Sequence, residues 1–174
     1  AYMSEQPRRQ HGVLFEKAIM DTSGVDWLNL HDVFKFVGDT LQEAGDISTA
    51  GLTGRVVHGL CVSGLTRNAP GIASAVDFLF DQQLSSGAWF GRWIVNQLAG
   101  TGWVLKALGA ADIDKDDPHV VKAVEWLRSV QNKDGGFGET PQSYVDPEHA
   151  GEGPSMPGLT GLVVCGLQCV GRGD

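Results

Sequence analysis

The sequence is poor in cysteine and in positive charge, and it has no long apolar run. Its 3 cysteines are odd in number and none stands in a CxxC pair, which argues against a disulfide framework and favours a reducing compartment. Its 13 Lys and Arg residues face 21 Asp and Glu residues, a net charge of −8, whereas a nucleic-acid partner requires a basic surface. No stretch of about 18 apolar residues is present, and the N-terminus lacks a signal-peptide pattern. These absences favour a cytoplasmic protein with no nucleic-acid partner.

Glycine, by contrast, is abundant, and part of it lies in a phrase that recurs three times. This phrase, Thr-Gly-x-Val-x-x-small-Leu, begins at Thr53, Thr101 and Thr160. A second phrase, with the core Ala-Val-acid-aromatic-Leu, begins at Ala75 and Ala123. Both phrases step by 48 residues between their first two copies, and the third Thr-Gly copy follows 59 residues later, which places an 11-residue insertion in the loop 138–158. A period of this size predicts stacked supersecondary units.

The two phrases predict two kinds of helix. Segments 71–84 and 118–131 have an apolar face and a charged face, as outer helices do, and Asp117-Pro118 provides an N-cap and first position for the second of them. Segments 101–109 and 159–170 are apolar nearly all round, which is typical of helices covered on every side. Small residues recur five positions apart in the Thr-Gly phrases. Because glycine costs a helix about 1 kcal/mol against alanine, close helix approach is the expected reason.

The predicted fold is therefore all-α, an α/α toroid (a partial α6-α6 barrel) in which inner and outer helices alternate. One partial-barrel domain is predicted over 1–174, with the repeats at 51–171 and an irregular or helical segment at 1–50 outside the period. Within that segment, 13–20 and 28–41 are candidate helices. The loop 138–158, rich in Gly and Pro, is predicted to be ordered by packing rather than by secondary structure.

The repeats resemble a known family. Segment 122–137, which reads Lys-Ala-x-x-Trp-Leu-x-x-x-Gln-x-x-x-Gly-Gly-Phe, resembles the QW repeat of squalene-hopene and oxidosqualene cyclases, and 75–89 is a weaker copy. The strings Trp-Phe-Gly-Arg-Trp-Ile-Val-Asn at 89–96 and Gln-Asn-Lys-Asp-Gly-Gly-Phe-Gly-Glu at 131–139 are similar to the C-terminal half of a bacterial squalene-hopene cyclase. The resemblance implies structural clamps between repeats at Gln83, Trp89, Trp126, Gln131 and Phe137.

The resemblance also implies a reaction, class II terpene cyclisation, in which an aspartic acid protonates a polyene without a metal or cofactor. The family's acid lies in a D-x-D-D motif expected upstream of residue 1, so no catalytic residue is predicted within this chain. The chain is then a fragment of a longer cyclase and is expected to be inactive alone. Its implied partners are a polyprenoid such as squalene and the rest of its own chain, together with peripheral membrane contact and a homodimer.

Two residues are predicted to line the substrate cavity. Trp93 resembles a family tryptophan of the cavity wall, where aromatic faces stabilise a carbocation. Arg55 stands where the family phrase D-V-T-A-H, aligned on residues 51–55, has its histidine; Gly51 replaces the aspartate, and Ala99 replaces a tyrosine. An arginine beside the acid would favour its carboxylate form. The alternative is that Arg55 pairs with a surface carboxylate.

Other polar residues are predicted to be structural. The acids in 114–117 match D-x-D-D literally, but they precede an outer helix and Pro118, so they are expected to cap that helix. Cys165 and Cys169, His58 and Trp103 are expected in the core.

Two other functions stay open. A protein-prenyltransferase β-subunit-like toroid would need zinc ligands, and a non-catalytic α/α-repeat module would bind a partner through its concave face. A cut repeat array exposes inner helices, so isolated copies are expected to associate.

Overall fold

The computed structural model describes residues 49–92 and 95–173. The chain divides into two units, Ala1–Ser48 and Thr49–Asp174, and all of the described residues belong to the second. The predicted helices at 13–20 and 28–41 and the predicted cavity residue Trp93 lie outside the described residues. One domain over 1–174 stays a prediction.

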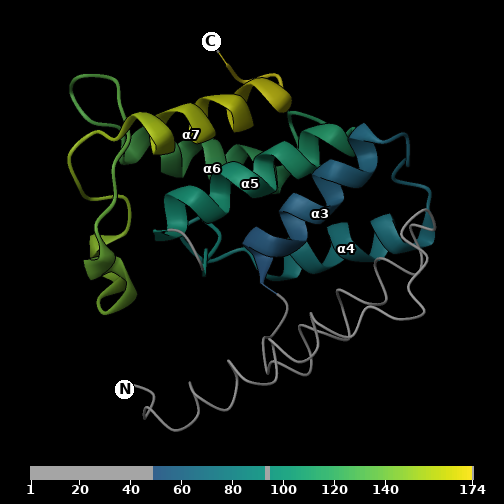
Figure 1. The fold of residues 1–174 in the computed structure, drawn as a ribbon, viewed down its shortest axis with the longest axis horizontal. Coiled ribbons are helices and arrows are strands. Elements are labelled where there is room, and N and C mark those ends of the chain that lie inside the picture. Colours follow the sequence, from purple (N-terminus) through teal and green to yellow (C-terminus); the bar gives the residue numbers. More distant parts are fainter. Residues whose placement is uncertain (1–48, 93–94, 174) are drawn as a thin grey trace, which may run out of the picture. The chain divides into compact units, whose positions relative to one another are not determined.

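The described part is all-α, as predicted, with no strand among its residues. Three helices carry the Thr-Gly phrase, and α5 lies between the other two, with contacts to both (Figure 1). They are α3 (Ala50–Val62), α5 (Asn96–Ala110) and α7 (Pro157–Cys169). Helices α4 (Pro70–Asp81) and α6 (Pro118–Ser129) alternate with them along the chain. The predicted order of inner and outer helices is therefore present.

Local sequence explains where the outer helices begin and how they end. Pro118 opens α6 directly after Asp117, whose side chain caps it, and Pro70 opens α4. The turns after these helices contain Gly87 and Gly135 at φ values of 101° and 82°. Only glycine adopts such φ values readily, which explains the Gly-x-aromatic part of the second phrase.

The inner helices differ in how far they are covered. Most of α5 is buried on all sides, as predicted for 101–109. Helix α7 buries Leu159, Val163 and Gly166, but its other face is exposed, so the prediction of complete cover is wrong for 159–170. The reason is that α7 packs on α5 along one side only.

Close helix approach accounts for some of the glycines in the Thr-Gly phrase. A Cβ on Gly54 would lie 3.0 Å from the Trp103 carbonyl oxygen, and one on Gly102 would lie 3.2 Å from that of Leu162. Gly54 thus faces the residue that follows Gly102, and Gly102 faces the residue that follows Gly161. The same contact therefore recurs between successive inner helices. Gly161, in the same position on α7, has nothing within 4 Å. Among the described residues, the face of α7 at Gly161 is therefore an open edge.

The loop 138–158 contains two short 3-10 helices, η1 (Pro141–Tyr144) and η2 (Pro147–His149). The prediction that it has no secondary structure is wrong in this respect, because Pro141 and Pro147 begin helical turns at N1. Backbone hydrogen bonds from Thr140 to Glu152 and from Met156 to Phe137 close the loop at its base.

The two repeated phrases are joined by a hydrogen bond that recurs. The backbone N–H of Trp89 donates to the Thr101 hydroxyl at 3.0 Å, and that of Phe137 donates to the Thr160 hydroxyl at 2.9 Å. Thr101 is fully buried. In these two copies, the hydroxyl of the threonine that begins the inner phrase accepts from the aromatic residue that ends the preceding outer phrase.

This bond predicts a stability difference between two substitutions of Thr101. Thr101→Val keeps the shape but leaves the buried Trp89 N–H without an acceptor, so we expect a loss of about 1–2 kcal/mol in the free energy of unfolding. Thr101→Ser retains the hydroxyl and should lose less. Urea unfolding of the three proteins measures both changes, and an equal loss for the two variants would contradict the assignment.

Candidate functional site

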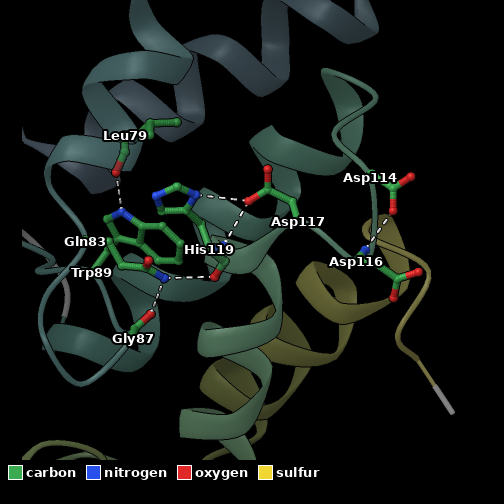
Figure 2. A network of polar contacts seen from close by, with 8 residues as sticks. All are labelled: Leu79, Gln83, Gly87, Trp89, Asp114, Asp116, Asp117 and His119. Carbon is green, nitrogen blue, oxygen red and sulfur yellow. Dashed lines mark hydrogen bonds and ion pairs between the residues drawn. The ribbon is translucent and has the colours of Figure 1, made fainter.

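The first clamp joins consecutive outer helices. Gln83 Nε2 donates to the carbonyl oxygens of Gly87 at 2.9 Å and of His119 at 2.8 Å, which links the end of α4 to the start of α6 (Figure 2). Trp89 is fully buried and its Nε1 donates to the Leu79 carbonyl at 2.6 Å. The Phe80 ring stacks on His119 with centroids 4.1 Å apart. These contacts fix one repeat against the next.

The second clamp has the buried aromatic residue of the first, but it makes no contact with a following outer helix among the described residues. Phe137 is buried like its equivalent Trp89, and Trp126 is buried whereas its equivalent Phe78 is half-buried. Gln131 Nε2 donates to the Gly135 carbonyl at 2.9 Å, matching the contact of Gln83 with Gly87, but Gln131 is exposed and makes no second contact among the described residues. Four of the five predicted clamp residues thus lie in two equivalent turns, one after α4 and one after α6, and Trp126 lies in α6 itself. Only the turn after α4 is linked to a following outer helix among the described residues.

Of the acids in segment 114–117, Asp117 caps α6, as predicted, whereas Asp114 and Asp116 make other contacts. Asp117 Oδ1 accepts from the His119 N–H at 2.9 Å, and Asp114 Oδ1 accepts from the Asp116 N–H at 2.8 Å (Figure 2). Asp116 pairs with Arg172 at 2.5 Å. These contacts account for all three carboxylates of the segment.

A small cavity gathers the three positions at which the chain departs from the cyclase phrases. Gly51 and Arg55 from α3 and Ala99 and Trp103 from α5 line it, together with the 91–92 segment. Its volume is about 20 Å³, enough for one water-sized group. A Cβ on Gly51 would make only ordinary contacts, the nearest at 3.7 Å from Gly91 Cα, so the backbone leaves room for a side chain there.

Arg55 is directed to an aromatic ring rather than to an acid. Its Cζ lies 5.0 Å from the centroid of the Trp103 ring, and Lys106 Nζ lies 4.6 Å from the same centroid. The predicted alternative of a carboxylate partner is not seen within 49–92 and 95–173. Arg55 lines this small cavity, and its place in a substrate cavity stays a prediction. Lys106 was missed, although its i+3 spacing from Trp103 places the two on one helix face.

Several residues expected in the core are less buried than predicted. Trp103 and His58 are half-buried, and Cys165 and Cys169 are exposed on the open face of α7. Burial, and then the charge of Lys106, lower the pKa of His58 below its ordinary value. The prediction of core thiols is wrong because it assumed that an apolar helix is covered on every side.

Sequence reasoning also missed Glu139, which caps α5 from the inserted loop. Its side chain is 2% exposed and accepts from three successive backbone N–H groups of α5, those of Asn96 at 3.3 Å, Gln97 at 3.1 Å and Leu98 at 2.7 Å. Burial, and then the Glu139 charge, raise the pKa of Tyr144, whose hydroxyl lies 2.9 Å from the Gly91 carbonyl. Because the cap comes from 41–43 residues away, helix-capping rules of local sequence do not find it.

Among the described residues no group of His, Cys, Asp and Glu has the geometry of a metal site. No described helix is long and apolar enough to cross a membrane.

Comparisons with known proteins agree with this geometry. The family model of the squalene-hopene cyclase C-terminal domain matches residues 29–174. The chain is 37% identical over 131 residues to the squalene–hopene cyclase of Zymomonas mobilis and 40% identical over 129 residues to a probable squalene–hopene cyclase of Sinorhizobium fredii, covering 74% and 73% of this chain and 20% of each relative. It is 46% identical over 103 residues to the squalene–hopene cyclase of Alicyclobacillus acidocaldarius, covering 59% of this chain and 16% of the relative. The aligned region thus spans between 16% and 20% of the length of these relatives.

Proposed function

The chain belongs to the squalene-hopene cyclase family, and from this premise we propose that it forms part of the wall of a longer triterpene cyclase acting on a polyprenoid such as squalene. The observation that carries the proposal is the repeated geometry of the clamps and inner helices. Trp89 and Phe137 occupy equivalent buried positions, and each is bonded to the threonine that begins the next inner phrase. This construction supports a layer of inner helices facing a substrate.

By itself the chain is proposed to be inactive. The inner helices α3, α5 and α7 contain no Asp or Glu, so they offer no carboxylic acid able to protonate a polyene. We propose that the acid, and with it the cation that begins cyclisation, comes from another part of the parent protein. We place that parent in the cytoplasm, with peripheral membrane contact and a homodimer as further proposals.

The test is cyclisation of squalene by the protein at its native length, beside the 174-residue chain, with products resolved by gas chromatography and mass spectrometry. We expect cyclic triterpenes from the native protein and none from the chain. Cyclic product formed by the chain alone would refute the proposal that the chain is inactive without the rest of the parent protein. A native protein that binds squalene without converting it would favour a binding role over catalysis.

The second candidate is a non-catalytic member that binds a ligand through its inner face. Gly51, Arg55 and Ala99 favour it, because they line one cavity and replace the polar residues expected around the acid. A prenyltransferase-like toroid would instead bind zinc, and a stoichiometric zinc content in protein prepared from metal-free buffer would favour it.

The open edge at α7 leads to a prediction about association. Gly161, Val164, Cys165 and Cys169 are exposed along this helix, and Gly161 has space for a neighbouring helix. We expect the isolated chain to form dimers or larger species as its concentration rises, because association buries the exposed apolar face of a repeat protein. Light scattering coupled to size exclusion measures this, and a monodisperse monomer at high concentration would contradict it.

A further inference from the structure

Charge is distributed unevenly between the layers of this acidic chain. The whole sequence carries a net charge of −8, yet the inner helices α3, α5 and α7 have no Asp or Glu. Their ionisable side chains other than cysteine are Arg55, His58 and Lys106, all of which are basic. The inner layer therefore bears positive charge in a protein that is otherwise negative.

Two of these basic groups meet at one indole ring. Arg55 comes from α3, and Lys106 and Trp103 come from α5, so the cluster bridges two inner helices. Both cations lie over the Trp103 ring, at 5.0 Å and 4.6 Å from its centroid, and neither forms an ion pair with a described residue. Both groups are positively charged, and an anion bound at this ring would offset their mutual repulsion.

The cluster also has hydrogen-bond donors that no group in the described part of the protein satisfies. Arg55 Nε and Trp103 Nε1 are buried and have no acceptor there. Contact with the ring face does not use these N–H groups, and a buried donor without a partner costs about 1–3 kcal/mol. Arg, Lys and Trp side chains are donors only, so the complementary ligand is a group that only accepts, with negative charge.

We propose that Arg55, Lys106 and Trp103 bind the oxyanion of a phosphorylated ligand, of the phosphate or diphosphate class. The guanidinium fork and the ammonium group match phosphate oxygens, and the cavity of about 20 Å³ beside Arg55 admits one oxygen atom. Leu52, Ala99 and Gly100 also line this cavity, which has no room for an apolar tail. The anion can be free diphosphate or the head of a polyprenyl diphosphate whose tail lies outside this cavity. The proposal goes beyond the proposed function and does not depend on it.

The test is a titration of the 174-residue chain with inorganic diphosphate at constant ionic strength, following the indole N–H signals of its 5 tryptophans by NMR. Trp103→Phe assigns the signal of Trp103. We expect that signal to shift and saturate, because its N–H gains an acceptor. Arg55→Gln and Lys106→Gln should each raise the dissociation constant about tenfold or more, since each removes a charged partner. Arg55→Lys should retain part of the affinity.

The matched control is Arg128→Gln, which removes one positive charge from the exposed face of α6. It should bind like the unmodified chain. An equal loss of affinity in this variant, or a Trp103 shift no larger than that produced by sodium chloride, would overturn the proposal. If circular dichroism shows that Arg55→Gln is unfolded, the dissociation constant of Lys106→Gln for diphosphate tests the proposal in the same way.

Two further ligands distinguish the sources of the anion. Tighter binding of farnesyl diphosphate than of diphosphate supports a tailed ligand, and equal affinities support free diphosphate. Farnesol has the tail without the anion, and a saturable Trp103 shift of the same size with farnesol would overturn the site as an anion site.

Discussion

Replacing Glu139 with alanine is expected to destabilise the described unit by about 3 kcal/mol, because it removes the acceptor of three N–H groups at the start of α5. These groups are buried, and the carboxylate also opposes the positive end of the helix dipole. Helix α5 lies between α3 and α7, so loss of its first turn affects both contacts (Figure 1). Urea unfolding followed by circular dichroism measures the change in the free energy of unfolding.

The control for this prediction is Glu125→Ala on the exposed face of α6, where the change should stay within about 0.5 kcal/mol. Glu139→Gln separates charge from shape, since its amide keeps one acceptor oxygen and should give an intermediate loss. A loss below about 1 kcal/mol for Glu139→Ala would show that water replaces the carboxylate and that the cap contributes little.

Two glycine-to-alanine substitutions in inner helices are expected to change stability in opposite directions. A Cβ on Gly109 would fall on the carbonyl oxygen of Cys169, a backbone atom that cannot rotate away. Gly109→Ala should therefore force α7 from α5 and cost about 3 kcal/mol. Gly161→Ala meets nothing within 4 Å and should stabilise α7 by about 0.5–1 kcal/mol through helix propensity.

The pair is informative because the two substitutions are chemically identical. Both can be measured by the same urea unfolding experiment, at concentrations where the chain is monomeric. Destabilisation by Gly161→Ala would mean that its face of α7 is already covered in solution, contrary to an open edge at this helix.

The periodic features of the sequence predicted the fold because they are local. Each helix occupies its predicted segment to within a few residues, apart from an earlier start of α5 at Asn96, and Asp117 caps α6 as its place before Pro118 indicates. The clamp role of Gln83 and Trp89 is what the resemblance to QW repeats implies, and the structure shows the hydrogen bond from Gln83 to His119 at the start of the next outer helix.

What the sequence did not predict depends on contacts between distant segments. Glu139 reaches α5 through an insertion that has no counterpart in the other repeat, so periodicity could not place it. Arg55 reaches Trp103 from another helix, α3, which passes α5 closely where Gly54 meets the Trp103 backbone. Cys165 and Cys169 are exposed because α7 packs on α5 along one side only.

The central claim is that this chain is one part of a longer cyclase, and the intact mass of the protein purified from its source tests that claim most directly. We predict a mass several times the 18.6 kDa of this chain, because the region aligned with its cyclase relatives is about a fifth of their length. A native mass equal to that of the chain would contradict the claim, since the inner helices would then have no partner to supply the acid, and ligand binding would become the favoured function.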